Sequence, residues 1–426
     1  MLNTLNDVLN NVDNFIWGMP LIILILFTGI LLTVRLRGLQ VRHLGKALHY
    51  VFHNEDDGEG EVTSFGALCT ALSATIGTGN IVGCATAIVA GGPGALFWMW
   101  LAAFFGMATK YAEGMLAVKY RVIAEDGHAL GGPFYYIEKG MGKNFKWLAK
   151  LFCVFGTMVG LFGIGTFTQV NGITSAVNNF FDPSNVHTIS LFGMDYSISV
   201  VVAGIIVTIC AGLVIIGGIK RISKVSEVIV PFMAVTYIGV CLIIVFTHLP
   251  QVPAAFAEIV QSAFGLKAVA GGAIGAMTVA MQKGIARGIF SNEAGLGSAP
   301  IAAAAAQTNE PVRQGLVSMT GTFIDTIIVC TMTGLAIVMT GAWDMGLEGV
   351  AVTTKAFALG LPFPAKASAF ILMMCLVCFA FTTILGWAYY SERCLEYLVN
   401  GKKFVITAFK WLYILAVFIG PFMTVS

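Results

Sequence analysis

The segment SATIGTGNIVG, residues 73–83, combines groups that could bind a small charged solute inside a membrane. It lies in a run from Val62 to Thr109 that has no Asp, Glu, Lys, Arg or His and is long enough to cross a bilayer. Its centre, Gly77-Thr78-Gly79-Asn80, is unfavourable for a continuous helix. Unpaired backbone at membrane depth is tolerated only where protein or a polar cavity satisfies it. The interruption therefore predicts a binding site.

A broken helix presents two kinds of ligand at one place. The free N–H groups of its outer half carry a partial positive charge and suit a carboxylate; Thr78, Gly79 and Asn80 would present them. The free carbonyls at the end of its inner half suit Na⁺ or an ammonium group. Such a break can therefore bind a solute that carries both charges.

Polar residues also occur within two other apolar segments. Gln169 and Asn171, in GTFTQVNG, have uncharged amides that can bond a carboxylate or an amine, or can form interhelical hydrogen bonds instead. Asp325 is the one acid in the stretch 314–343, and carboxylates within membrane segments are candidate functional residues. It could coordinate a cation, carry a coupled proton, or accept bonds from Thr322 and neighbouring helices.

Other motifs indicate no further chemistry. Cys375 and Cys378 have redox spacing, but apolar surroundings keep thiols protonated. No Walker sequence occurs, and no G-x-G-x-x-G follows a strand, so nucleotide binding has no support. The net charge of +2, without a basic array, gives no indication of nucleic-acid binding.

The composition is that of a multi-spanning membrane protein. The 426 residues are 57% hydrophobic and 11% charged, with a mean hydropathy of +0.85, whereas soluble domains carry about 25% charged residues. The alternating pattern of barrel strands does not occur, so we expect an all-α polytopic fold. Ten ranges are long and apolar enough to span: 15–34, 64–90, 94–117, 147–180, 197–217, 226–247, 268–289, 314–340, 366–390 and 404–424.

Basic residues indicate the orientation. Lys and Arg gather after spans 1, 3, 5, 7 and 9, whereas the opposite loops contain three lysines, Lys267, Lys355 and Lys366. The positive-inside rule therefore places the N-terminus outside. The polar segment 53–61 is expected to be a solvated cytoplasmic loop, and Lys110 with Glu113 an interfacial ion pair near the inner end of span 3.

A second interruption is predicted in AVAGGAIGAM, residues 268–277, with Gly272, Gly275 and Met277 lining the other wall of the site. Glycines here could also serve close helix packing, and Met277 could be ordinary packing. Spans 2 and 7 run in opposite directions, so two interrupted helices at corresponding places indicate inverted repeats. The segment NEAGLGSAP, 292–300, is expected in the following connection, as a short closing helix or a turn.

Three motifs carry a family resemblance: ATIGTGNIVG at 74–83, GGPGALFWMWLAAFFG at 91–106 and FSNEAGLGSAPIAAAAA at 290–306. Together they closely resemble the alanine/glycine:cation symporters, the sodium:alanine symporter family. That family is similar in fold to leucine-transporter-type proteins, with inverted five-helix repeats and here one extra N-terminal helix. The resemblance implies one transport domain, 1–426. Its parts are a leading helix and loop at 1–60, a first repeat at 61–250, and a second repeat at 251–426 that lacks the family's last helix.

The resemblance also implies a sodium site. Its ligands would be the carbonyls of Ser73, Ile76 and Phe379 and the hydroxyls of Thr382 and Thr383. These oxygen ligands suit a hard cation, although membrane threonines also bond back to carbonyls of their own helix. The family places a substrate-contacting glutamine where this chain has Gln169, which favours that residue over its neighbour Asn171.

The expected protein is a secondary active symporter, not an enzyme. It would couple inward Na⁺ movement to uptake of a small neutral amino acid, alanine or glycine, in the plasma membrane of a prokaryote. The same fold could carry glutamine or another amino acid, or could use protons through Asp325. A substrate-gated channel or a membrane sensor is the alternative from another class, which downhill flux without accumulation would indicate.

Overall fold

The computed structural model describes residues 12, 16, 18–53, 58–124, 127–191, 194–266 and 272–423. The described residues form two antiparallel hairpins: β1 (Val122–Ile123) with β2 (Ala129–Leu130), and β3 (Thr188–Leu191) with β4 (Met194–Ser197). The α-helices are α2 (Met19–Arg35), α3 (Leu39–Arg42), α4 (Leu44–Phe52), α5 (Ser64–Thr75), α6 (Cys84–Gly91), α7 (Gly94–Lys119), α8 (Pro133–Tyr136), α9 (Lys146–Phe162), α10 (Phe167–Phe181), α11 (Ile198–Ile215), α12 (Gly218–Thr247), α13 (Val252–Ala263), α14 (Ala273–Asn292), α15 (Ala299–Ala303), α16 (Pro311–Thr322), α17 (Thr331–Met339), α18 (Val350–Gly360), α19 (Ala365–Leu398) and α20 (Lys403–Ile419). The π-helical segments are η1 (Gly79–Gly83), η2 (Ile137–Met141) and η5 (Phe323–Cys330), and the 3₁₀ segments are η3 (Lys143–Phe145), η4 (Leu249–Gln251), η6 (Ala342–Asp344) and η7 (Gly420–Phe422).

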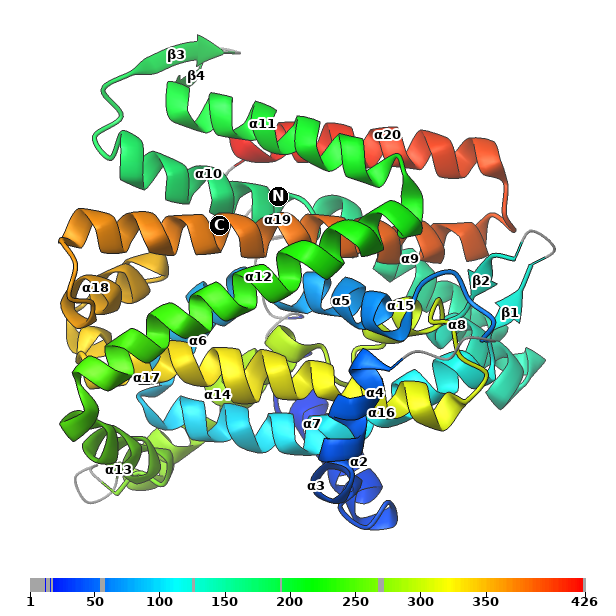
Figure 1. Ribbon diagram of the computed structural model, residues 1–426, viewed down its shortest axis with the longest axis horizontal. Helices are drawn as coiled ribbons and strands as arrows, with labels where there is room; N and C mark the ends of the chain where they lie inside the picture. Colours follow the sequence, from blue (N-terminus) through cyan, green and yellow to red (C-terminus); the bar gives the residue numbers. More distant parts are fainter. Residues whose placement is uncertain are drawn as a thin grey trace.

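The long helix α19 runs along the long axis of the molecule and separates two groups of helices (Figure 1). On one side α10, α11 and α20 pack together, and on the other α7 packs against α14 and α16. The helix α5 lies between the groups and contacts both α12 and α19. A Cβ on Gly386 would lie 2.7 Å from the Cβ of Ala74, so α5 and α19 approach this closely because residue 386 has no side chain.

Among the described residues, six helical stretches are long and apolar enough to cross a membrane, or seven if α5 and Gly79–Gly91 form one bent span. The chain is therefore an all-α polytopic membrane protein. Helices occur in all ten ranges that the sequence predicts as spans, although residues 15, 17, 268–271 and 424 lie outside the described part. Three of the ten predicted ranges, 15–34, 94–117 and 268–289, are not among these candidate spans. They contain α2, which is 17 residues long, and α7 and α14, which include charged residues.

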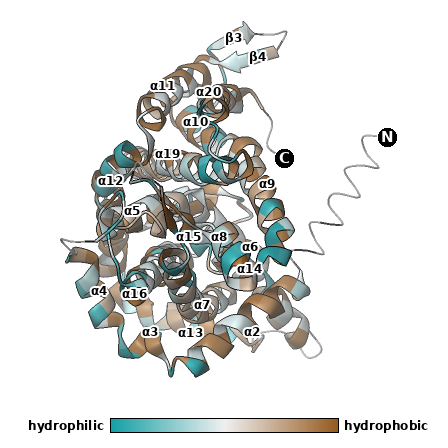
Figure 2. Cartoon of the chain, turned by 90° about the vertical axis from the view of Figure 1, so that its right-hand side faces the viewer, coloured by the Kyte–Doolittle hydropathy of each residue, from teal (hydrophilic) through white to brown (hydrophobic). Residues whose placement is uncertain are grey.

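Apolar side chains cover much of the outer surface. Viewed from one end, α2 and α11 lie on the outside of the bundle and are made largely of hydrophobic residues (Figure 2). On α11 the exposed residues include Ile206, Ile209 and Leu213. A surface of this kind is stable in contact with lipid tails, so the outer faces of these helices indicate contact with the bilayer.

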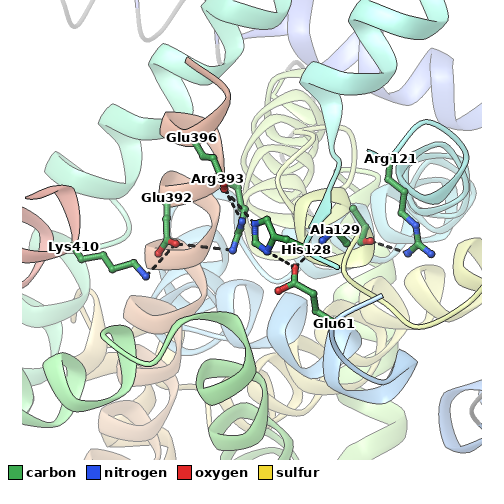
Figure 3. Close-up of polar contacts among 9 residues, drawn as sticks. Glu61, Arg121, His128, Ala129, Glu392, Arg393, Glu396 and Lys410 are labelled. Carbon is green, nitrogen blue, oxygen red and sulfur yellow. Dashed lines mark hydrogen bonds and ion pairs between the residues drawn. The ribbon is translucent and has the colours of Figure 1, made fainter. Parts of the chain in front are cut away.

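An ionic network joins three segments at the end of the bundle where α19 terminates (Figure 3). Glu61 Oε1 lies 3.0 Å from His128 Nδ1 and accepts the backbone N–H of Ala129 at 3.1 Å. His128 Nε2 lies 3.5 Å from Glu396 Oε2, and Arg393 donates to that oxygen at 2.5 Å. The segment before α5, the β1–β2 hairpin and the end of α19 are therefore connected through side chains.

The end of the predicted solvated loop at 53–61 forms hydrogen bonds to the rest of the chain. Residues 54–57 lie outside the described part of the chain, but Val62 is buried and forms a parallel bridge with Ala306. The guanidinium of Arg121 donates to the carbonyls of four residues, Glu59, Ala304, Ala306 and Thr308. The end of this segment thus packs against the connection that follows α15, while the side of the segment at Glu59 remains exposed.

The stability of this network should depend on pH through Glu61. Burial opposes its ionisation, but the hydrogen bond from His128, the charge of Arg393 and the N–H of Ala129 lower the pKa of its carboxyl below the ordinary value. Such a carboxyl stabilises the fold above its unfolded pKa of about 4.3, and this contribution is lost as pH falls through the lower folded-state pKa. Glu61→Gln should lower the thermal unfolding midpoint in detergent at pH 7 by a few degrees.

The difference from wild type should shrink when the same scans are made near pH 4, because glutamine does not titrate. Glu348→Gln removes an exposed acid and should leave the midpoint unchanged at both pH values. An equal loss in Glu61→Gln at pH 7 and pH 4 would contradict this account of the network.

Candidate functional site

A cavity of about 250 Å³ lies among α5, α9, α10, α14 and α19. Gly77 and Gly79 contribute backbone to its wall, Gln169 comes from α10, and Thr383 and Trp387 come from α19. The opposite wall is formed by the end of α14 and the connection that follows it. A water molecule occupies about 30 Å³ in the liquid, so the cavity has room for a solute of a few non-hydrogen atoms.

The predicted interruption after α5 is confirmed. The helix ends at Thr75, Ile76 is extended, and the axis bends by 53° before the chain continues as a helix. The N–H of Gly77 donates to Asn80 Oδ1 at 3.0 Å instead of to a helical carbonyl. In a continuous helix that N–H would bond to the carbonyl of Ser73, which is therefore released from the helical ladder.

The structure separates the three residues predicted to present N–H groups to a solute. Gly79 lines the cavity. Asn80 is fully buried behind the wall: its Oδ1 accepts from Gly77, and its Nδ2 donates to Asp325. The methyl of Thr78 lies toward Gly172 on α10, away from the lining residues. The side chain of Asn80 therefore stabilises the break, because both ends of its amide are already bonded.

The predicted sodium ligands come from two elements that the structure brings together. Thr383 on α19 lies directly against Gly77, where a Cβ would overlap its hydroxyl. The hydroxyls of Thr382 and Thr383 both donate to the carbonyl of Phe379 at 3.0 Å, the back-bonding that the sequence left as an alternative. A hydroxyl that donates still has lone pairs with which it can coordinate a cation.

Gln169 is the clearest candidate for contact with a solute. It is 3% exposed and lines the cavity, and its Oε1 has no hydrogen-bond partner among the described residues. A Cβ on Gly77 would lie 3.6 Å from that oxygen, so the amide is close to the break. Asn171 instead donates to the carbonyl of Met423 at 3.1 Å, outside the lining. A buried amide without a partner is costly unless a ligand bonds to it.

Asp325 connects the two ends of the site. It lies in the π-helical segment η5 and is fully buried. Its Oδ1 accepts from Asn80 at 2.7 Å, and its Oδ2 accepts from Ser291 at 2.9 Å and from Thr326 at 2.7 Å. One carboxylate therefore bonds both the first break and the end of α14. The predicted donor Thr322 has no partner among the described residues.

Comparison with known proteins identifies the family. Residues 2–426 match the sodium:alanine symporter family. The chain belongs to this family. Its members are sodium-coupled amino-acid symporters and not enzymes.

Three relatives show the range of names within the family. An uncharacterized transporter of Haemophilus influenzae is 55% identical over 422 residues, which cover 99% of this chain and 88% of the relative. The sodium/alanine symporter AgcS of Methanococcus maripaludis is 46% identical, covering 95% of this chain and 87% of the relative. The probable sodium/glutamine symporter GlnT of Bacillus subtilis is 38% identical, covering 95% and 80%.

A second break lies at the C-terminal end of α14, whereas the sequence predicts an interruption at 268–277, around the start of that helix. Residues 267–271 lie outside the described part, but Gly272 precedes α14 and Gly275 and Met277 lie in its first turns. None of the three lines the cavity; Met277 is about 20 Å along the helix axis from Phe290, which does. The prediction that they form the other wall is therefore corrected.

The wall comes instead from the NEAGLG segment, residues 292–297. Here α14 ends, and three residues adopt left-handed backbone: Glu293 with φ 55°, Gly295 with φ 90° and Gly297 with φ 77°. A helix cannot continue through such a run. The sequence signal was present in the closely spaced glycines, but the polar residues beside them suggested a connection outside the membrane segment.

Lys110 and Glu113 stabilise this second break. They are 3% and 8% exposed, so both side chains lie inside the helix bundle. The Nζ of Lys110 donates to the carbonyl of Asn292 at 2.7 Å, at the end of α14 where a cation is favoured by the helix dipole. Glu113 Oε1 accepts the N–H of Gly297 at 3.1 Å. The side chains of Lys110 and Glu113 thus replace helical hydrogen bonds that are lost at the break.

Proposed function

We propose that this protein is a secondary active symporter that couples inward Na⁺ movement to uptake of a small neutral amino acid, alanine or glycine. The observation that carries the proposal is a cavity between two broken helices, with a Gln169 oxygen in its wall that has no hydrogen-bond partner among the described residues. Family membership and the name of the relative AgcS support the same solute and ion.

A zwitterionic amino acid matches the two breaks. Its carboxylate would bind at the backbone of Gly79, where the helical part that follows directs its positive end toward the cavity. Na⁺ would bind at the junction of α5 and α19, to the carbonyls of Ser73, Ile76 and Phe379 and to the hydroxyls of Thr382 and Thr383. The released carbonyl of Ser73 and the contact of Thr383 with Gly77 support this assignment.

The proposed architecture has ten spans in two inverted repeats, 61–250 and 251–426, after a leading helix. The two broken helices lie near each other and are bridged by Asp325, as expected for the moving bundle of an alternating-access transporter. The basic loops support an outside N-terminus in a prokaryotic plasma membrane. Each charge that crosses contributes about 2.3 kcal/mol per 100 mV, which corresponds to roughly fiftyfold accumulation.

Uptake of radiolabelled L-alanine into proteoliposomes tests the proposal. We expect accumulation above the external concentration when Na⁺ is outside and the interior is negative, and none when choline replaces Na⁺. Equal alanine uptake in Na⁺ and in choline would overturn sodium coupling. Alanine flux that only equalises the internal and external concentrations would indicate a channel.

Thr383→Val should raise the Na⁺ concentration for half-maximal uptake about tenfold, because it removes one oxygen ligand and keeps the side-chain shape. Thr340→Val is the matched control. That threonine also bonds back to its own helix, at Ala336, but does not line the cavity. An unchanged Na⁺ dependence in Thr383→Val would remove this residue from the proposed site.

Glutamine is the second candidate substrate, and the name of the relative GlnT favours testing it. Competition of labelled alanine uptake by glycine, glutamine and D-alanine separates the substrates. Stronger competition by glutamine than by glycine would reassign the solute and leave the coupling mechanism unchanged.

A further inference from the structure

The cavity wall contains one carboxylate among its described residues, that of Glu293. The residue is 4% exposed and follows directly on α14, and its backbone has a left-handed φ of 55°. This conformation is uncommon for a residue with a side chain and is maintained by the packing of the second break. The position of the carboxylate is thus fixed by the fold and not by a mobile loop.

One oxygen of the Glu293 carboxylate is held by a hydrogen bond, and the other is available to a ligand. Its Oε2 accepts a hydrogen bond from Ser298 Oγ at 2.5 Å, and both residues line the cavity. Within the described chain no hydrogen bond is donated to Oε1. An ionised carboxylate can accept about four hydrogen bonds, so most of its capacity is available to a ligand.

The described surroundings of Glu293 carry more negative than positive charge. Three carboxylates face this region, those of Glu293, Glu113 and Asp325, and one ammonium group, that of Lys110. The Lys110 ammonium donates to the carbonyl of Asn292. Buried carboxylates are costly unless a cation compensates them, so a positively charged group that enters the cavity is favoured.

The two breaks are close enough for one small solute to reach both. A Cβ on Gly79 would lie 3.8 Å from the Cα of Ser291, two residues before Glu293. A short molecule with its carboxylate at the first break could therefore extend its other charged group toward the second.

We infer that Glu293 receives the ammonium group of the transported amino acid and thereby selects zwitterions over simple carboxylates. The inference rests on the proposed function and adds the residue that distinguishes an amino acid from its analogue without nitrogen. The hydroxyl of Ser298 acts as a positioning group for the carboxylate. Asp325, with three donors already bonded to it, and Glu113, bonded to the backbone of Gly297, are not available for this role.

Calorimetric titration of the purified protein in NaCl tests this with two probes, L-alanine and propionate. Glu293→Gln should weaken L-alanine binding about 10- to 100-fold, the range for losing a hydrogen bond to a charged group, and leave propionate binding unchanged. Titration with Na⁺, followed by tryptophan fluorescence, should give the same result in Glu293→Gln and in wild type, because the proposed sodium ligands are untouched. Glu348→Gln, an exposed acid, is the matched control and should behave as wild type.

Ser298→Ala keeps the carboxylate and removes only its orienting bond, so it should weaken L-alanine severalfold with propionate unaffected. This variant keeps the test decisive if Glu293→Gln does not fold. L-alanine affinity equal to wild type in the variants that fold, or equal losses for both probes, would overturn the inference. If wild type binds no L-alanine in NaCl, the proposed function itself fails, and the inference with it.

Discussion

Gly77→Ala is expected to lower Na⁺-dependent alanine uptake about 100-fold, the effect of displacing a site by roughly 1 Å. The new Cβ would overlap Thr383 Oγ1 and lie 3.6 Å from Gln169 Oε1. Thr383 cannot turn aside at little cost, because its side chain is β-branched and its hydroxyl is bonded to Phe379. The break must therefore move away from α19, which separates the proposed sodium ligands and shifts the cavity wall.

Two neighbouring glycines provide matched controls for this change. Gly83 has helical backbone, with φ −64°, and open space around its Cβ position, so Gly83→Ala should leave uptake unchanged. A Cβ on Gly79 would make only ordinary contacts with Phe290 and Ser291, so Gly79→Ala should reduce uptake less than Gly77→Ala. Uptake is measured in proteoliposomes with equal amounts of protein. Full activity in Gly77→Ala would contradict the close packing of the break against α19.

The first break was predictable because its signals are local. Gly77, Gly79 and Asn80 occur together in the middle of a long uncharged run, and each disfavours a continuous helix on its own. The general positions of the helices were predictable for the same reason, since each is an apolar run of sufficient length. The gap at 163–166, between α9 and α10, was not predicted, although Gly163 and Gly165 were visible there.

The second break could not be located from sequence because its cause is tertiary. Lys110 and Glu113 of α7 bond to the backbone at Asn292 and Gly297 and so make it possible to bury this polar segment. Without knowledge of that packing, the charged residues on α7 indicate the membrane–water interface, and the NEAGLG segment indicates a loop. The paired glycines at 271–272 were the stronger local signal, but residues 267–271 lie outside the described part of the chain, so an interruption there stays a prediction.

The partner of the Asn80 side chain could not be predicted for a related reason. Nothing near Asn80 in the sequence offers its amide a carboxylate. Its partner is Asp325, which lies 245 residues further along the chain. Spacing along the sequence cannot show such a pair, because the fold of η5 against η1 brings the two residues together.

Asp325→Asn is expected to raise the Na⁺ concentration for half-maximal uptake at least tenfold, with the unfolding midpoint within about 3 °C of wild type. Asparagine has nearly the same shape, keeps one acceptor for the amide of Asn80, and can donate to the hydroxyls of Ser291 and Thr326. The bridge between the breaks therefore survives, and only the negative charge is lost. Asp344→Asn, at an exposed acid, should change neither quantity.

Asp325→Ala removes both the negative charge and the hydrogen bonds that join the two breaks, so its comparison with Asp325→Asn distinguishes the two effects. It leaves the Asn80 amide and two hydroxyls without an acceptor, and breaking a buried charged network costs about 3–5 kcal/mol. The unfolding midpoint should therefore fall by roughly 5–10 °C.

If Asp325 carries a proton instead of favouring Na⁺, Asp325→Asn would abolish the pH dependence of uptake and leave the Na⁺ requirement unchanged. If Asp325→Asn unfolds as readily as Asp325→Ala, the ionised carboxylate itself is what joins the two breaks.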